Sequence, residues 1–112
     1  MSAIRNRVSL IGRLGKDPET KAFDSGKQKT SFSLATKEVY KKDGEKKETT
    51  QWHNVVMWDG LAKTASEYLT KGQEVAIEGK VTYRSYDDKE GNTRYITEIV
   101  ASDMHMLGNK AS

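Results

Sequence analysis

The hydrophobic periodicity of this 112-residue chain changes twice along its length. It goes from a two-residue period to helical spacing and then back to a two-residue period. Near the start, Val8, Leu10 and Leu14 share one parity, while polar residues fill much of the other. Alternation of this kind predicts strands that bury one face. The spacing becomes helical after residue 59 and alternates again from Val75. The pattern therefore predicts strands on both sides of a single helix.

Five segments have the strand pattern and one has the helix pattern. The expected strands cover residues 6–14, 29–40, 49–58, 75–83 and 94–102, and the helix carries Leu61, Ala65, Tyr68 and Leu69 between Asp59 as N-cap and Gly72 as stop. Asp43 and Gly44 are a turn signal at the tip of a charged hairpin. Five short antiparallel strands, with a helix between strands 3 and 4, predict an all-β five-stranded Greek-key barrel of the OB-fold type.

Composition limits the chemistry of the chain. It has no cysteine and only two histidines, so we expect no metal and no cofactor. Asp87 and Asp88 are adjacent in a turn, and His53 has no evident catalytic partner, so we expect no enzyme. No apolar run reaches the ~20 residues of a membrane span. The length suits one domain over 1–107 with a short disordered end over 108–112.

The aromatic residues divide into two groups by their position in the strand pattern. Trp52 and Trp58 share the parity of Asn54, whereas the apolar neighbours point the other way. Tyr86 shares the parity of polar and basic positions, and Tyr40 stands at the mouth of the lysine-rich hairpin. We therefore do not expect these four side chains in the core. We do expect Phe32, Tyr68, Tyr83 and Tyr95 to be core residues.

Exposed aromatics among cations suit single-stranded nucleic acid, because every base has a flat face that stacks and every nucleotide carries a phosphate. The net charge of +3 permits such a partner without requiring it. The candidates for base stacking are Tyr40, Trp52, Trp58 and Tyr86. The candidates for phosphate binding are Arg7, Lys37, Lys41, Lys42, Lys46, Lys47, Lys71, Lys80, Arg84 and Arg94.

A series of short motifs follows in one order along residues 6–107. They are Asn6-Arg7-Val8, Leu10-Ile11-Gly12-Arg13-Leu14-Gly15, Asp17-Pro18-Glu19, Leu34-Ala35-Thr36, Trp52-His53-Asn54-Val55-Val56, Ser66-Glu67-Tyr68-Leu69, Ile77-Glu78-Gly79-Lys80 and Thr97-Glu98-Ile99-Val100. No single motif is specific, but so many in one order are. In these motifs the sequence closely resembles the bacterial and mitochondrial single-stranded-DNA-binding protein family.

The resemblance implies an OB fold assembled as a homotetramer that binds and protects single-stranded DNA, without sequence preference, in replication, recombination and repair. It implies that the four candidate aromatics stack on bases and that His53 is a subunit contact. We expect a cytoplasmic, nucleoid-associated protein in preference to an organellar one, with no membrane partner. The usual acidic tip of bacterial members is missing from these residues, so recruitment of replication and repair proteins through it is not supported.

Two other classes of function stay open at this point. One is an OB-fold adaptor that acts mainly through protein contacts in a replication complex; the retained Trp52 and Trp58 argue against it. The other is an OB module for RNA, since recognition of the 2′-hydroxyl depends on geometry that residue types do not reveal.

Overall fold

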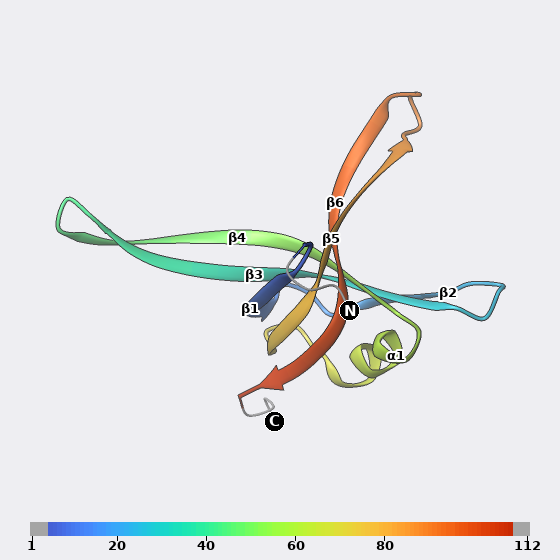
Figure 1. Cartoon of the computed structure of the whole chain (residues 1–112), viewed down its shortest axis with the longest axis horizontal. Coiled ribbons are helices and arrows are strands. Elements are labelled where there is room, and N and C mark those ends of the chain that lie inside the picture. Colours follow the sequence, from blue (N-terminus) through green and yellow to red (C-terminus); the bar gives the residue numbers. More distant parts are fainter. Residues whose placement is uncertain (1–4, 109–112) are drawn as a thin grey trace.

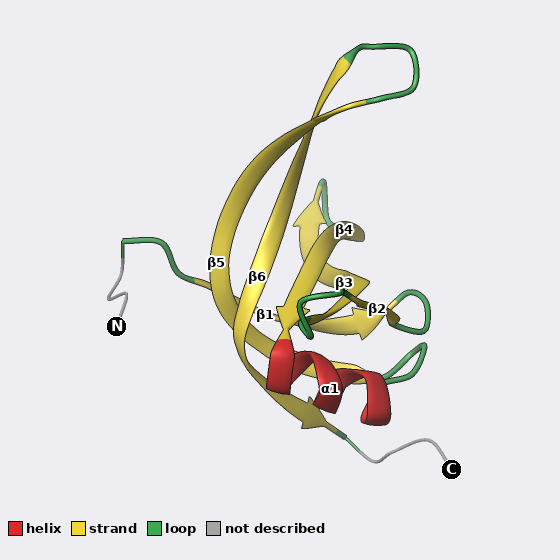
Figure 2. Cartoon of the chain, turned by 90° about the vertical axis from the view of Figure 1, so that its right-hand side faces the viewer, coloured by secondary structure: helices red, strands yellow, loops and turns green. Residues whose placement is uncertain are grey.

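The structure is a computed structural model and describes residues 5–108, so most of the expected end over 108–112 lies outside the described residues. The strands are β1 (Val8–Leu14), β2 (Glu19–Ala22), β3 (Gln28–Lys42), β4 (Glu45–Trp58), β5 (Glu74–Asp87) and β6 (Thr93–Leu107). The helix α1 (Asp59–Tyr68) lies between β4 and β5 and covers one end of the sheet (Figure 2).

Five of the strands close into a barrel. The sheet runs in the order β1-β5-β6-β4-β3-β2, and a further pairing of β1 with β3 closes it. Strand β2 lies outside the closed ring and pairs only with β3. The helix follows the third of the five barrel strands (Figure 1). The predicted five-stranded barrel with one inserted helix is therefore confirmed.

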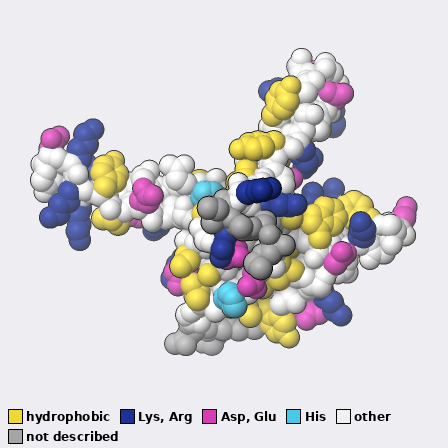
Figure 3. All heavy atoms as spheres, in the orientation of Figure 1, with side chains coloured by type: hydrophobic (Ala, Val, Ile, Leu, Met, Phe, Trp, Pro, Cys, Tyr) yellow, Lys and Arg dark blue, Asp and Glu magenta, His cyan; other side chains and the backbone are white. Residues whose placement is uncertain are grey.

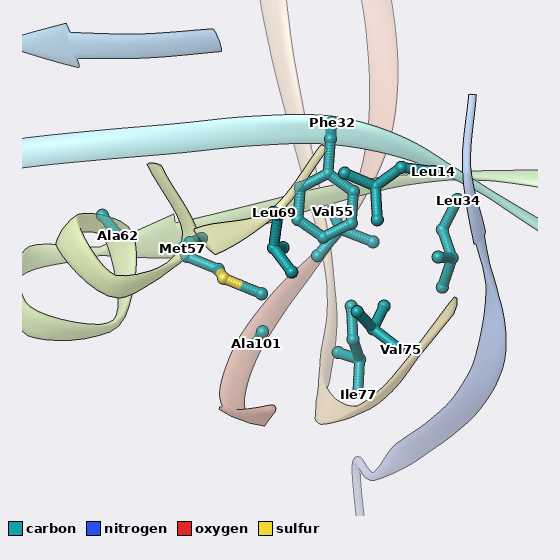
Figure 4. Close-up of a cluster of buried hydrophobic side chains, with 11 residues drawn as sticks. Leu14, Phe32, Leu34, Val55, Met57, Ala62, Leu69, Val75, Ile77 and Ala101 are labelled. Carbon is teal, nitrogen blue, oxygen red and sulfur yellow. The ribbon is translucent and has the colours of Figure 1, made fainter. Parts of the chain in front are cut away.

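The core lies inside this barrel and beneath the helix. Figure 4 shows side chains from the strands and from α1 meeting in one cluster. Leu34, Val55, Met57 and Val75 have no exposed surface in it. These positions follow the alternation of the sequence, so the hydrophobic pattern of the strands correctly predicted which faces turn inward.

The barrel closes along two short seams. β1 pairs with β3 only through Arg13 and Leu14, and β4 pairs with β6 only through Val55 and Val56. The β4–β6 seam is parallel, so the prediction of wholly antiparallel strands is wrong there. The prediction of short strands is also wrong, since β3 and β6 have 15 residues each and β4 and β5 have 14.

Two long hairpins leave the barrel, β3–β4 in one direction and β5–β6 in another (Figure 1). Every residue from Lys37 to Lys42 is exposed, because no second layer covers the hairpin there. At the tip, Asp43 and Gly44 have φ angles of 54° and 78°. Two successive positive φ angles are the geometry of a type I′ turn, which matches the twist of paired strands. The turn predicted at these two residues is confirmed.

The expected core role of Tyr83 and Tyr95 is wrong. Their exposed fractions are 78% and 83%. Tyr83 and Tyr95 lie on the same pleat face as the buried residues Ile77 and Ile99. At the two tyrosines, however, β5 and β6 extend beyond the end of the barrel, so no core lies against that face. Phe32, which lies within the barrel, is 6% exposed and is a core residue as predicted.

The helix differs from its prediction in two details. Its N-cap is Trp58 rather than Asp59, and no side chain caps it by a hydrogen bond. Asp59 is instead the first helical residue, with a φ of 53°. The buried residues of the helix are Ala62 and Ala65, so Tyr68 lies beside the buried face and is 46% exposed rather than in the core.

Candidate nucleic-acid interface

The two tryptophans lie on the outer face of β4. Trp52 is 62% exposed and Trp58 is 39% exposed, while Val55 and Met57 between them are fully buried. Asn54 shares the outer face and is also exposed. The sequence prediction that both indoles face away from the core is confirmed, and two large flat side chains stand at opposite ends of one short stretch of strand.

Trp52 packs over the chain at Gly15. A Cβ atom at this glycine would lie 2.5 Å from Cζ3 and 2.9 Å from Cη2 of the indole, well inside van der Waals contact. The absence of a side chain at Gly15 therefore leaves the space that the indole of Trp52 occupies. Gly15 follows β1, far from Trp52 in the sequence, and its backbone amide donates a hydrogen bond to the carbonyl of Ser33 on β3 at 3.0 Å.

Trp58 contacts two residues that the sequence analysis did not single out. The ring of Phe23, just after β2, stacks on the indole with 5.9 Å between centroids and 28° between planes. The ammonium of Lys29 lies 5.8 Å from the centroid of the indole, a cation–π arrangement. Lys29 is the cross-strand partner of Trp58. Strand alternation in β3 could have revealed Lys29, but Phe23 belongs to a turn with no pattern.

A groove of about 290 Å³ crosses the outer face between these elements. Residues of β3, β4, β5 and β6 line it, together with residues between the end of β1 and the start of β2. The lining includes Lys16, Lys29, Ser31, Ser33, Asn54, Arg84 and Glu98. The groove therefore combines hydroxyl and amide groups with three cations and three carboxylates, the latter from Asp17, Glu19 and Glu98, next to an aromatic side chain that Lys29 contacts.

An ion pair fixes one cation in this groove. The guanidinium of Arg84 donates hydrogen bonds from Nε and Nη2 to the carboxylate of Glu98, at 2.8 and 3.2 Å. Glu98 is 8% exposed. The hydrogen bonds from Arg84 lower the pKa of Glu98 below its ordinary value, against the opposing effect of burial. The same hydrogen bonds raise the pKa of Arg84, so both groups stay charged near neutral pH.

The two tyrosine candidates lie on the hairpins. Tyr86 is 49% exposed, and its parity on β5 is that of Arg84, which lines the groove. Tyr40 is 47% exposed and pairs with Lys47. The continuous register of β3 and β4 puts Tyr40 on the pleat face opposite to Trp52. The structure thus puts Tyr86 on the pleat face of Arg84, outside the groove lining, and puts Tyr40 on the face opposite to Trp52.

The ten candidate phosphate ligands divide by their ion pairs. Five of them bind a carboxylate, in the pairs Arg7–Glu78, Lys37–Glu48, Lys47–Glu45, Arg84–Glu98 and Arg94–Asp88. The other five form no salt bridge with any acidic residue between residues 5 and 108; they are Lys41, Lys42, Lys46, Lys71 and Lys80. Unpaired ammonium groups are the ones that exchange only water and counterions when they meet a phosphate.

His53 lies at the boundary between the barrel and the β3–β4 hairpin. It is half-buried, and its Nε2 is 2.9 Å from Oγ1 of Thr36. With Trp52 and Tyr95 it lines a separate cavity of about 320 Å³. No group of acidic and histidine side chains suited to a metal ion occurs among the described residues. None of the helices in the described part of the chain is long and apolar enough to span a membrane.

A closed five-stranded barrel with exposed aromatics and cations around a groove on its outer face defines a nucleic-acid-binding OB-fold protein. The chain belongs to the single-strand binding protein family, whose family model matches residues 5–107. Membership agrees with the expectation that the chain is no enzyme, since this is a family of DNA-binding proteins.

Named relatives support the same assignment. The chain is 50% identical over 109 residues to "Single-stranded DNA-binding protein 1" of Chlorobaculum tepidum, covering 96% of this chain and 67% of that protein. It is 46% identical over 107 residues to the protein of the same name in Xylella fastidiosa, covering 94% and 79%. Both are bacterial, which agrees with the expected cytoplasmic location.

A solved structure has the same fold. A Plasmodium falciparum SSB in complex with ssDNA superposes with a TM-score of 0.86 at 31% identity, covering 96% of this chain and 99% of that one. The similarity extends over the barrel, the helix and both hairpins, because nearly the whole of each chain takes part.

Proposed function

We propose that this protein binds single-stranded DNA without sequence preference by stacking bases on Trp52, Trp58, Tyr86 and Tyr40. The observation that carries the proposal is the exposure of both tryptophans on the outer face of β4, where a core role is impossible. Stacking uses only the flat face of a base, so it tolerates any sequence. The Plasmodium falciparum relative was solved with ssDNA, which supports the same ligand here.

Phosphate contacts are the second part of the proposal. The unpaired lysines Lys41, Lys42 and Lys46 on the β3–β4 hairpin, with Lys71 and Lys80, bind phosphates without breaking an ion pair. The five paired candidates, Arg7, Lys37, Lys47, Arg84 and Arg94, must exchange or share a carboxylate first. We therefore assign them a smaller part of the salt dependence, since counterion release requires a free cation.

We further propose that the protein works as a homotetramer, the general state of its family. The outer face of the sheet carries Ile11 at 61% exposure, which lines a hollow with Ala76 and His105, and exposed apolar surface of this kind favours self-association. Most of β1 has one unpaired edge, because its contact with β3 is confined to Arg13 and Leu14. In this assembly His53 is a subunit contact, and its hydrogen bond to Thr36 fixes the ring.

The biological role that fits such a coat is protection of unpaired strands during replication, recombination and repair, in association with the nucleoid. The bacterial relatives are named as single-stranded DNA-binding proteins, which supports the binding step of this role. Partners among replication and repair proteins are left open. The sedimentation coefficient at micromolar and nanomolar protein measures the assembly, and a monomer that still binds DNA tightly would contradict the tetramer.

The binding proposal is tested by titrating the protein with oligo-dT, duplex DNA and oligo-rU, while following tryptophan fluorescence. Stacking predicts quenching by oligo-dT and little response to duplex. Trp52→Ala and Trp58→Ala should each weaken oligo-dT binding by about 1–3 kcal/mol. Full affinity in both folded variants would refute stacking, and tighter binding of oligo-rU than of oligo-dT would favour the RNA module.

A further inference from the structure

We propose that the β2 edge of the sheet is an additional nucleotide subsite, in which the ring of Phe23 stacks on a base and Lys21 and Lys29 bind the neighbouring phosphate. This inference rests on the proposed function and extends the path of the strand beyond Trp58. It adds a binding site on β2, the one strand among residues 5–108 that lies outside the barrel.

The register brings these side chains onto one face. Lys21 on β2 is opposite Lys29 on β3, and Lys29 is opposite Trp58 on β4. Directly opposite residues of antiparallel strands share a face, so the three form a row across the outer surface. Phe23 lies two residues beyond Lys21 and reaches the indole of Trp58, with 5.9 Å between ring centroids. Figure 3 shows hydrophobic and basic side chains side by side over this part of the molecule.

The stack leaves an open aromatic face. Phe23 is 43% exposed although it packs against Trp58, so part of its surface remains accessible. Lys29 and Phe23 both contact the indole, which is consequently the less exposed of the two tryptophans. A base that continues the column can therefore stack on Phe23, in the offset geometry that aromatic pairs prefer.

The two lysines point to an anion. Lys21 and Lys29 face each other directly, and like charges in this arrangement destabilise a strand pair. Neither forms a salt bridge with an acidic side chain in the described part of the chain. A phosphate between them removes the repulsion and gains two charge-assisted contacts.

The edge is well enough fixed to act as a site. Oγ1 of Thr20 on β2 is 2.9 Å from Oγ1 of Thr30, which donates a hydrogen bond at 2.9 Å to the carbonyl of Ala62 in the helix. The backbone amide of Phe23 donates to the carbonyl of Lys27 at 2.8 Å, closing the turn after β2. Strand, turn and helix thus fix the backbone at Phe23, and Trp58 supports its ring, before any ligand arrives.

Photocrosslinking tests the contact directly. Oligo-dT carrying 5-iododeoxyuridine links to aromatic rings that stack on its bases, and mass spectrometry of the digested complex identifies them. We expect adducts on Phe23 as well as on Trp52 and Trp58. Adducts on the tryptophans without one on Phe23 would overturn the subsite, because Phe23 would then only support Trp58. Absence of all three adducts would instead refute the stacking proposal itself.

Affinity provides the second measurement. Phe23→Leu keeps an apolar side chain in the turn and should weaken oligo-dT binding about fivefold or more, the lower end of the effect of losing a stacked base. Lys21→Gln should reduce the log–log salt slope by about 0.7, as for one phosphate on a single strand. Lys63→Gln, at an exposed position of the helix, is the charge-matched control and should leave the slope unchanged. Unchanged affinity in F23L and an unchanged slope in K21Q would overturn the subsite.

Discussion

Gly15→Ala should impair DNA binding while leaving the fold intact. The new Cβ would lie 2.5 Å from Cζ3 of Trp52, so the ring has to move by about 1 Å to reach the 3.4 Å of an ordinary contact. Trp52 is 62% exposed and can move outward without disturbing the core. No positive φ occurs at Gly15, so alanine brings no backbone strain there.

The expected sizes of the two effects differ. Stability should change little or rise by about 0.4–1 kcal/mol, because alanine restricts the unfolded chain more than glycine does. Binding should weaken by about 1 kcal/mol, or roughly fivefold, since a displaced indole loses a large part of one base stack. A rise in stability together with a loss of affinity separates a positioning role of Gly15 from a general folding defect.

Urea denaturation and oligo-dT titration measure the two quantities on the same preparation. Gly60→Ala is the matched control, since a Cβ at Gly60 meets no atom within 4 Å. It should bind like the parent chain. The fluorescence spectrum of unliganded G15A should also shift, because Trp52 changes its surroundings. Parental affinity with a parental spectrum in G15A would show that Trp52 does not need the space at Gly15 and would refute the positioning role of this glycine.

Two further predictions concern charge. Glu98→Gln should lower the free energy of unfolding by about 1–2 kcal/mol at neutral pH, because a nearly buried carboxylate loses its charged hydrogen bonds to Arg84. Since the folded-state pKa of Glu98 is lowered, this stabilisation is present above the ordinary pKa of 4.5 and is lost as the pH falls through the folded-state pKa. Denaturation curves of the parent and E98Q should therefore differ at neutral pH and converge at acid pH. A difference that stays constant with pH would contradict the pairing of Glu98 with Arg84. Replacing Lys41 and Lys46 by Gln should reduce the salt slope of oligo-dT binding by about 0.7 for each phosphate lost, whereas Lys37→Gln, which removes a lysine paired with a carboxylate, should reduce it less. Equal slopes for the parent and the double variant would remove these two lysines from the phosphate path.

The hydrophobic pattern predicted the barrel because the pattern and the core have the same physical cause. In the barrel part of the strands, alternation correctly predicted that Phe32 and Leu34 face the core and that Trp52 and Trp58 face outward. Beyond the barrel the alternation of β5 and β6 continues with no core to face. Parity alone could not tell where the barrel ends, and the core assignment of Tyr83 failed for that reason.

Other features left no trace in the sequence pattern. All four residues of β2 are exposed, so no alternation marked the strand. The contact of Phe23 with Trp58 joins a turn to a distant strand, and neither residue type nor spacing encodes it. Ion pairing decides which cations are free, and pairs such as Arg7–Glu78 form across strands far apart in the sequence. The sequence therefore identified candidate cations, but it could not show which of them are free of a carboxylate partner and so available to bind a phosphate.

The two narrow seams of the barrel have a consequence for the order of folding. The β3–β4 and β5–β6 hairpins gain their contacts between residues close in sequence, and isolated hairpins form in about 1–10 μs. The β4–β6 seam joins Val55 to Ile99, and β1 pairs with β5 between Val8 and Gly79. These residues are farther apart in sequence than any hairpin pair, so these closures cost more chain entropy and are slower. We therefore expect two hairpins to form early and to dock through β1 and through Val55 and Val56 in the rate-limiting step. Amide hydrogens at these seams should gain protection last during refolding.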